Sequence, residues 1–381
     1  MSTPSTPKRP RVDARELPDG SMNGNSVAAG SSFAVTQLVL DEPVAENWTH
    51  LKFTHAGKEY AVELADSDRV FDLKEKLQTL TLVPFERQKI LGLVKGKLPP
   101  DDVTILDLKL PPTKKFQLIG TPEGQELKER SEMDMPDVFS DWDIDLSANP
   151  VLEAAFANDR RNVRKIREAA AKLNINMMSQ LRPGKKLLVL DIDYTIVDTI
   201  PLTSGALPPS ECARPGLHDF MEAVYPYYDI VIWSQTSWIW LETKLVELGM
   251  VGSDRNYKIA FVLDKTSMFT VFSTPESKTT KQKHSVKALK IIWTRFPQFG
   301  PANTVHVDDL GRNFALNPGE GIKIHAFKDC HTTASMQDTE LPRLGKYLVH
   351  LGANVQDFRT VKHKDWRKTA DTLPPPPPPH P

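Results

Sequence analysis

The sequence contains only two cysteines, Cys212 and Cys330, in 381 residues. So few thiols exclude a disulfide-stabilised fold and are typical of a protein kept in a reducing compartment. Long apolar runs are also missing, since no stretch reaches the roughly 20 residues that cross a bilayer. The polar, proline-containing N-terminus lacks the apolar core of a signal peptide. We therefore expect a soluble intracellular protein without a membrane partner.

The chain also lacks an excess of charge of either sign, because 48 Lys and Arg residues face 49 Asp and Glu residues. A net charge of −1 gives no overall attraction to nucleic acid or to a membrane surface. Hydrophobic residues make up 40% of the chain, which is enough for a sizeable core. The length exceeds that of most single domains, so we expect more than one domain and no direct nucleic-acid partner.

The composition of both ends of the chain predicts terminal tails. Residues 1–48 are rich in Ser, Pro, Gly, Asn and Ala, which predicts a disordered N-terminal tail. Its basic cluster PKRPRV, residues 7–12, fits either a nuclear import signal or a solvated tail. Residues 371–381 form a proline-rich tail that we expect in the polyproline II conformation. This tail is either a plain extended end or a ligand for an SH3, WW or profilin-type domain.

Residues 49–121 predict a first domain. Alternation of apolar and polar residues around HAGK indicates a β-hairpin, and Val70, Leu73 and Leu77 have helical spacing. Asp66 or Ser67 is the expected N-cap of that helix. The predicted elements are a hairpin over 49–64, a helix over 66–81, and strands over 87–93 and 114–120. This order resembles that of the ubiquitin-like β-grasp (α+β) domains, with an unrelated small α+β domain as the alternative.

The ubiquitin-like resemblance implies a docking module rather than a conjugated tag, because the chain runs on after Gly120 without a terminal Gly-Gly. In such proteins the module binds the regulatory particle of the 26S proteasome. The basic loop Leu93–Lys97 resembles the contact loop of that family, and a solvated loop is the alternative reading.

Residues 122–149 are dense in acidic side chains, which predicts a linker extended by self-repulsion. Its segment VFSDWDI, residues 138–144, is apolar enough to dock on a neighbouring surface. Residues 150–370 then form a second domain. The domain opens with a segment whose composition and periodicity predict one helix over 150–175.

The rest of the second domain alternates strands and helices. Continuous apolar runs, typical of strands buried on both faces, occur at residues 186–190, 229–233, 258–263, 303–307 and 322–327. Helices are predicted over 214–225, 237–250 (with Gly249 as its C-terminal cap) and 284–296. This alternation predicts an α/β fold with a doubly wound, mostly parallel sheet.

Polar side chains follow several of these strands. Asp191, Ser234 and the pair Asp308 and Asp309 each come where an apolar strand ends. In such sheets ligands bind outside the carboxyl ends of the strands, so a functional edge is expected there. Asp193 lies two residues after Asp191, and in extended chain both side chains would face one site.

Carboxylates that lie this close need a cation or a proton between them. Asp191, Asp193, Asp308 and Asp309 offer oxygen ligands that suit Mg2+. A calcium EF-hand loop also begins with two aspartates, but Ile196 stands where that loop needs glycine, and Leu202 where it needs glutamate. We therefore expect a magnesium site.

These residue types also suit hydrolysis of a phosphate ester. Asp191 can attack phosphorus and become an aspartyl-phosphate, while Asp193 moves the proton of the leaving group and of water. The hydroxyl of Ser234 or Thr195 can hydrogen-bond a phosphoryl oxygen, and Lys287 can neutralise its charge.

The motif order in LDIDYT, IWS, the lysine and DDLGRNF resembles that of the haloacid dehalogenase (HAD-like) superfamily, and more narrowly the FCP/SCP-type protein serine/threonine phosphatases. From Trp48 to Arg367 the chain resembles the ubiquitin-like domain-containing phosphatases of that type, which are nuclear enzymes that act on the proteasome. The resemblance implies that Asp191 accepts phosphate and binds Mg2+.

By the same resemblance, Asp193 is the general acid and base, with its backbone carbonyl on the metal, and Thr195 supports the motif. Ser234 holds phosphate, and Lys287 is the motif lysine, although Lys283 and Lys290 lie near it. The resemblance further implies that Asp309 binds the metal directly and that Asp308 supports it.

Only short segments separate Asp198 from the helix over 214–225, which leaves no room for a cap domain and favours a phosphorylated protein loop as substrate. Three functions stay open at this point: a phosphatase of proteasome subunits, a phosphatase of the RNA polymerase II C-terminal domain, and a non-catalytic proteasome adaptor. The intact set of candidate residues speaks against the adaptor.

Overall fold

The computed structural model describes residues 45–111, 113–123, 143–144, 150–252, 255–274 and 281–374. All of these residues belong to one compact unit, Leu40–Pro381. Most of the two tails and of the acidic linker expected from the sequence lie outside the described residues. In the described part of the chain, no helix combines the length and the apolar character that crossing a bilayer requires.

The first domain is built on a four-stranded sheet with the order β2-β1-β4-β3. Its strands are β1 (Trp48–His55), β2 (Lys58–Ala65), β3 (Lys89–Leu91) and β4 (Lys115–Ile119). The β1–β2 hairpin turns through Ala56 and Gly57, which both have positive φ, as a two-residue hairpin loop requires. β1 and β4 pair in parallel, whereas the outer pairs are antiparallel. The predicted strands and the ubiquitin-like β-grasp order are confirmed.

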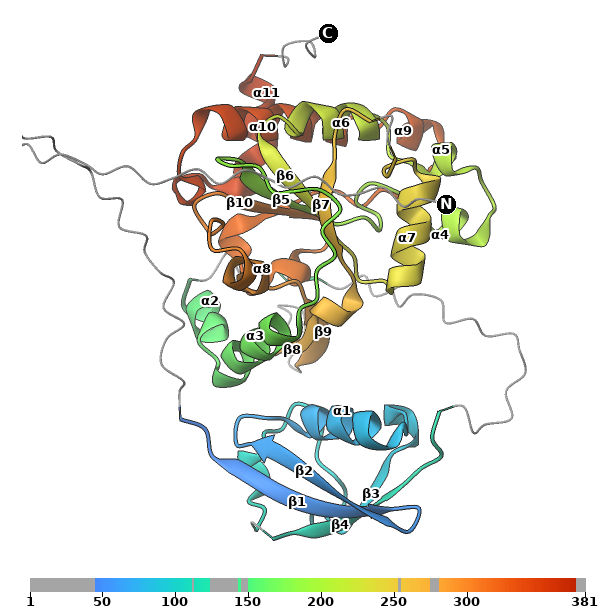
Figure 1. The fold of residues 1–381 in the computed structure, drawn as a ribbon, viewed down its shortest axis with the longest axis vertical. Helices are drawn as coiled ribbons and strands as arrows, with labels where there is room; N and C mark the ends of the chain where they lie inside the picture. Colours follow the sequence, from blue (N-terminus) through green and yellow to red (C-terminus); the bar gives the residue numbers. More distant parts are fainter. Residues whose placement is uncertain are drawn as a thin grey trace, which may run out of the picture. The chain divides into compact units, whose positions relative to one another are not determined.

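Helix α1 (Val70–Thr81) packs its apolar side on this sheet, with Leu73 and Leu77 in the same buried cluster as Leu51 and Phe53 of β1 (Figure 1). The helix begins later than the sequence predicted, since its N-cap residue is Arg69 and not Asp66 or Ser67. The carboxylate of Asp72 reaches back to accept the Arg69 backbone N–H at 2.8 Å. An acid in the first turn thus replaces the expected cap.

The second domain begins with two helices where the sequence predicted one. These are α2 (Pro150–Ala157) and α3 (Arg160–Lys172), which are separated at Asn158. The break arises because Asp159 caps α3, with its side chain accepting the Asn162 backbone N–H at 3.2 Å. A strong N-cap residue can start a new helix inside a sequence with good helix propensity throughout.

A five-stranded parallel sheet with the order β11-β10-β5-β6-β7 forms the centre of this domain. Its strands are β5 (Lys186–Leu190), β6 (Tyr228–Trp233), β7 (Ile259–Leu263), β10 (Thr304–Asp308) and β11 (Gly321–Lys323). The predicted doubly wound parallel sheet is confirmed, although β11 is shorter than its apolar run. The strand order reverses between β5 and β10, which is where such sheets form their ligand sites.

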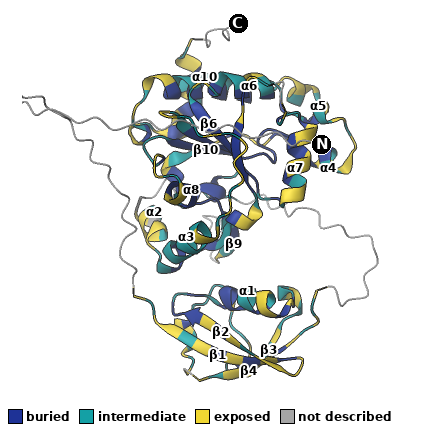
Figure 2. Ribbon diagram, viewed as in Figure 1, coloured by how far each residue is buried: buried dark blue, intermediate teal, exposed yellow. Residues whose placement is uncertain are grey.

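Both faces of this sheet are covered, so its strands appear buried in Figure 2. Leu188 and Leu190 of β5 pack in one core cluster, whereas Leu187 and Val189 pack in another. The first cluster contains residues of α6 (Leu217–Val224), α7 (Trp238–Glu247), α10 (Glu340–Asn354) and α11 (Trp366–Thr372). The second contains residues of α3 and of α8 (Lys290–Arg295). The short helices α4 (Thr199–Ser204), α5 (Pro209–Cys212) and α9 (Thr333–Met336) complete the α-helices of the described residues.

A separate hairpin replaces the first part of the third predicted helix. β8 (Phe269–Ser273) and β9 (Gln282–Val286) form an antiparallel two-stranded sheet, and α8 begins only at Lys290. The predicted helix was wrong over 284–286 because these residues pair with Phe269–Val271. Lys287 therefore follows a strand rather than opening a helix.

Candidate active site

The residues predicted at the strand ends lie along one edge of the parallel sheet. Asp191 follows β5 directly, Ser234 follows β6, and Asp308 is the last residue of β10. The register pairs Leu190 of β5 with Val307 of β10, so Asp191 and Asp308 leave the sheet side by side. The Asp191 backbone N–H continues this pairing by donating to the Val307 carbonyl at 3.0 Å.

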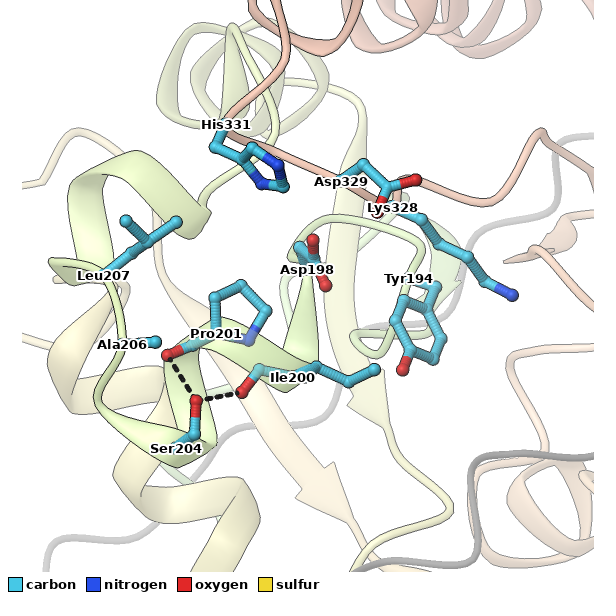
Figure 3. Close-up of a pocket in the computed structure, with 10 residues that line it drawn as sticks. All are labelled: Tyr194, Asp198, Ile200, Pro201, Ser204, Ala206, Leu207, Lys328, Asp329 and His331. Carbon is cyan, nitrogen blue, oxygen red and sulfur yellow. Dashed lines mark hydrogen bonds between the residues drawn. The ribbon is translucent and has the colours of Figure 1, made fainter.

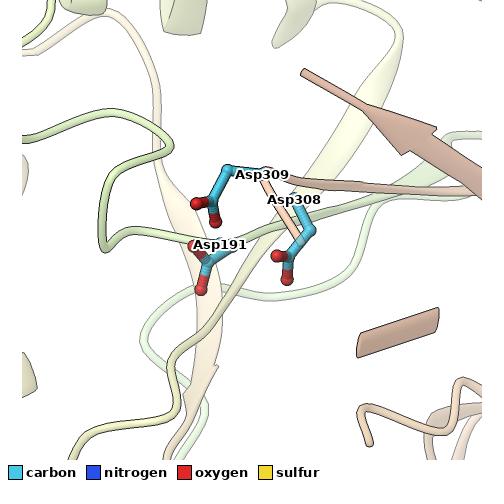
Figure 4. A group of neighbouring side chains, drawn as sticks. All are labelled: Asp191, Asp308 and Asp309. Atoms are coloured by element: carbon cyan, nitrogen blue, oxygen red, sulfur yellow. The ribbon is translucent and has the colours of Figure 1, made fainter. Parts of the chain in front are cut away.

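Three carboxylates meet at this edge (Figure 4). One carboxylate oxygen of each of Asp191, Asp308 and Asp309 lies within 4.8 Å of the other two. All three side chains are buried. Such an all-oxygen set suits a hard divalent cation.

Lys287 is the cation that this structure places against the cluster. Its Nζ donates to Asp191 Oδ1 at 2.5 Å and to Asp308 Oδ2 at 2.7 Å. Burial disfavours the charged amine, but the two carboxylates outweigh burial and raise the pKa of Lys287 above its usual value. Lys287 therefore stays protonated and holds the two strand ends together.

One lysine does not balance three carboxylates. Burial, together with the neighbouring carboxylates, raises the pKa of Asp191 to about 7 and that of Asp309 to about 9. Burial also disfavours ionisation of Asp308, but Lys287 and His306 outweigh it and hold the pKa of Asp308 well below its usual value. The three carboxyl groups can carry more negative charge than Lys287 neutralises. The residues present therefore fit a bound divalent cation.

Thr195 links two of these carboxyl groups. Its Oγ1 donates to Asp191 Oδ2 at 2.8 Å and accepts the Asp309 backbone N–H at 3.2 Å. Together with Lys287, this hydroxyl gives each oxygen of Asp191 one donor, which fixes the orientation of the carboxylate. Thr195 is fully buried, so it supports Asp191 from behind the site.

Asp193 is held by a different set of side chains. Its Oδ2 accepts from Ser234 Oγ at 2.9 Å, and its Oδ1 accepts from Thr199 Oγ1 at 2.6 Å and from Lys244 Nζ. The next residue, Tyr194, has φ +56°, so the chain leaves the extended conformation directly after Asp193. The Asp193 carboxylate lies outside the three-carboxylate group, although it adds to burial and to Asp308 in raising the pKa of Asp191.

The structure adds residues that sequence reasoning missed. Lys244 lies on the buried side of α7 next to Leu241 and Leu245, and its spacing from these leucines was the available signal. Asn313, in the quoted GRNF segment, donates from Nδ2 to both oxygens of Asp308 at 2.8 and 2.9 Å. His306 Nε2 lies 3.4 Å from Asp308 Oδ2. Nothing in the sequence pattern pointed to His306, because it reads as part of an apolar strand.

Part of the acidic linker also reaches this region. Asp143, in the segment predicted to dock, accepts the backbone N–H groups of Gly311 at 3.1 Å and Arg312 at 2.7 Å. These residues directly follow the Asp308–Asp309 loop. Asp143 of the linker therefore contacts the second domain beside the carboxylate cluster.

A pocket of about 470 Å³ adjoins the segment Asp191–Thr195 at Tyr194 (Figure 3). Ile200, Pro201 and Leu207 give it apolar walls on one side, and Lys328 and Asp329 lie on the opposite side. The lining of this pocket therefore combines apolar and charged groups.

Comparison with known proteins identifies the family of this chain. Residues 186–359 match the family described as NLI interacting factor-like phosphatase. The proteins named ubiquitin-like domain-containing CTD phosphatase 1 from Rattus norvegicus and Homo sapiens are each 42% identical to this chain over 317 residues. Each alignment covers 82% of this chain and 94% of the relative.

Among solved structures, the UBL domain of Plasmodium falciparum Dsk2 is 26% identical and covers 20% of this chain and 100% of its own. Its TM-score is 0.17, so the fold of the first domain rests on the strand order described above and not on this likeness. The relatives, by contrast, match across both domains. The chain therefore belongs to the family of ubiquitin-like domain-containing CTD phosphatases, with a phosphatase domain of the NLI interacting factor type.

Proposed function

We propose that the chain is a Mg2+-dependent protein serine/threonine phosphatase that forms an aspartyl-phosphate on Asp191. The observation that carries this proposal is the oriented carboxylate of Asp191, which lies between Lys287 and Thr195 and next to two further carboxyl groups. A nucleophile fixed in this way is prepared for in-line attack on phosphorus.

Asp191 and Asp309 would hold the metal ion, with Asp308 as a support fixed by Asn313. When bound, Mg2+ supplies positive charge against the phosphoryl oxygens. Lys287 adds a second positive charge on the same side, because its amine already contacts Asp191. Together these charges offset the negative charge that would otherwise keep an anionic substrate away from Asp191.

The remaining proton chemistry falls to Asp193. Asp191 attacks phosphorus while Asp193 donates a proton to the leaving serine or threonine oxygen. In the second half-reaction Asp193 takes a proton from the water that attacks phosphorus of the acyl phosphate, which breaks the bond to Asp191 and releases inorganic phosphate. Ser234, whose hydroxyl contacts Asp193, would bind a phosphoryl oxygen of the substrate.

The test of this chemistry is phosphopeptide turnover with Mg2+ or with EDTA, on the wild-type protein and on Asp191→Asn. We expect turnover only for the wild type with Mg2+. A phosphopeptide should be preferred over a sugar phosphate, because the open, partly apolar pocket next to Tyr194 suits polypeptide. Equal, negligible turnover in all cases would instead favour the adaptor.

For the substrate we propose proteasome subunits, reached in the nucleus through docking of the ubiquitin-like domain on the 26S regulatory particle. The ubiquitin-like fold supports this choice, since Lys95 and Lys97 are exposed on the loop that resembles the contact loop of that family. The alternative substrate is the RNA polymerase II C-terminal domain, which the name CTD phosphatase of the relatives favours. An SH3, WW or profilin-type partner of the proline tail remains a prediction for residues outside the described part of the chain.

Charge reversal at Lys95 and Lys97 tests the docking. We expect the Lys95→Glu/Lys97→Glu protein to lose co-purification with the proteasome and to keep its turnover of a phosphopeptide. The matched control is Lys52→Glu/Lys58→Glu, which changes the same charge on exposed positions of β1 and β2. Retained co-purification of the loop variant would contradict this docking surface.

A further inference from the structure

Helix α3 carries a row of basic residues on the side that faces away from the core of its own domain. Ile166 packs this helix into the core of the phosphatase domain. The basic residues on its other side are Arg160, Arg161, Arg164 and Lys165, and each contacts an acidic residue of the segment Asp66–Glu75. That segment contains the start of α1 of the ubiquitin-like domain. The two helices therefore have complementary charge.

Arg161 and Asp72 form the centre of this contact. Arg161 Nε lies 2.6 Å from Asp72 Oδ2, and its Nη2 lies 2.7 Å from Oδ1, so the pair is bidentate. The two side chains are 1% and 0% exposed. Lys165 Nζ adds a second cation 3.1 Å from Asp72 Oδ1. Charges of this kind stay buried only when paired with good geometry, so the contact is specific.

The same contact includes the β8–β9 hairpin. Arg161 Nη1 donates to the Thr270 carbonyl of β8 at 2.9 Å. The ring of Phe71 in α1 lies edge-on to Phe272 of β8, with 5.8 Å between their centroids. On β9, Lys283 Nζ lies 5.5 Å from the centroid of the Phe71 ring. Both strands of the hairpin thus contact the ubiquitin-like domain.

The hairpin also delivers the candidate catalytic lysine. β9 ends at Val286, and Lys287 follows immediately. The two strands pair only with each other in the described residues and are not part of the five-stranded sheet. The position of Lys287 therefore depends on what packs against the hairpin as well as on its own backbone N–H, which donates to the Asn313 carbonyl at 2.8 Å.

We propose that the acidic start of α1 is an intramolecular docking surface for α3 and the β8–β9 hairpin, and that this docking holds Lys287 in place. The proposal goes beyond the proposed function, since it assigns the ubiquitin-like domain a role inside the phosphatase itself. It leaves Lys95 and Lys97 exposed, so a receptor can bind that loop while α1 stays docked.

Hydrogen–deuterium exchange on the full chain tests the docking with Asp72→Asn. This change removes the charge that Arg161 binds and keeps an oxygen for the Arg69 N–H cap. We expect faster exchange in β8, β9 and the Lys287 backbone N–H, with β5 and β10 unchanged. The matched control Glu63→Gln removes one exposed carboxylate from the same domain and should leave all exchange unchanged.

Arg161→Gln removes the other partner of the same ion pair, on the phosphatase domain. Because both changes break the same interaction, the double variant Asp72→Asn/Arg161→Gln should exchange no faster than either single variant. If Arg161→Gln fails to fold, Asp72→Asn still tests the docking, since Asp72 lies on the other domain. Unchanged exchange of β8 and β9 in Asp72→Asn would overturn the docking. Faster exchange of β8 and β9 with an unchanged Lys287 N–H would overturn the link to Lys287.

Turnover gives a second measurement. We expect Asp72→Asn to lower kcat for an aryl phosphate about 3- to 10-fold, because a small displacement of a positioned group slows a fixed-geometry reaction. An inactive wild-type protein would refute the proposed function. The docking would then be tested by hydrogen–deuterium exchange alone. Faster exchange at Lys287 with an unchanged kcat would overturn the claim that docking places this lysine for catalysis.

Discussion

Lys244 contacts Asp193 inside the phosphatase domain, and the two side chains are only 1% and 5% exposed. A lysine this deeply buried is rare unless it is paired. The same carboxylate also accepts from the hydroxyls of Ser234 and Thr199, so three donors from three segments fix its position. We infer that Lys244 positions the group that we propose as the general acid and base.

Replacing Lys244 should therefore affect protonation of the leaving group. Lys244→Met keeps the length of the side chain and removes the amine, and we expect kcat for a phosphoserine peptide to fall about 10- to 100-fold. Turnover of p-nitrophenyl phosphate should fall much less, because nitrophenolate leaves without a proton. The exposed Lys258→Met serves as control. Equal losses with both substrates would contradict a role through Asp193.

The strand ends were predictable from sequence because they depend on local patterns. An apolar run followed by a polar residue marks where a buried parallel strand ends, and this held for Asp191, Ser234 and Asp308. The partners of Asp193 were not predictable, because Thr199, Ser234 and Lys244 come from segments that only the tertiary fold brings to its carboxylate. Lys244 was also missed, because a lysine in a helix of mixed composition is usually interpreted as a surface residue.

Misreadings also arose where distant residues decide the local structure. His284–Val286 has helical apolar spacing with the residues that follow, yet it forms β9 because Phe269–Val271 lies beside it as a partner. The long helix over 150–175 was divided because Asp159 prefers the N-cap position to the helix interior. Helix propensity alone favours a helix in both segments. Strand pairing changed the secondary structure of the first, and N-capping by Asp159 divided the second.

Asp309→Asn should stabilise the metal-free protein at alkaline pH. The pKa of Asp309 is raised from 3.8 to about 9, so the folded state keeps a proton that the unfolded state has lost. The folded state therefore loses stability as pH rises from about 4 to about 9. We expect Asp309→Asn to raise the melting temperature in EDTA, and more at pH 8 than at pH 5. The exposed Asp107→Asn should show no such difference, and a lower melting temperature for Asp309→Asn would contradict the prediction.

Binding of Mg2+ should release protons from the same cluster. At pH 7 the carboxyl of Asp309, with its pKa of about 9, holds a proton, and metal ligation requires the ionised form. Calorimetric titration with Mg2+ in two buffers of different ionisation enthalpy measures this release. We expect the number of protons released to fall between pH 7 and pH 9.5, and to be smaller for Asp309→Asn. Heats that do not depend on the buffer at pH 7 would contradict the prediction.

His363 should make the phosphatase domain sensitive to acid. Its side chain is buried against Tyr347, whose hydroxyl lies 2.6 Å from His363 Nδ1, and burial lowers the pKa of His363 from 6.5 to about 4. Between these two values the unfolded state binds a proton that the folded state does not, so stability is lost as pH falls from about 6.5 towards 4. A shift of this size corresponds to at most ~3 kcal/mol.

Urea unfolding of the wild type and His363→Gln at pH 7 and pH 4.5 measures this contribution. We expect the free energy of unfolding to fall less with acidification in His363→Gln, because glutamine does not titrate. The exposed His331→Gln serves as the control and should keep the wild-type dependence. An equal loss for wild type and His363→Gln would show that other groups cause the acid sensitivity.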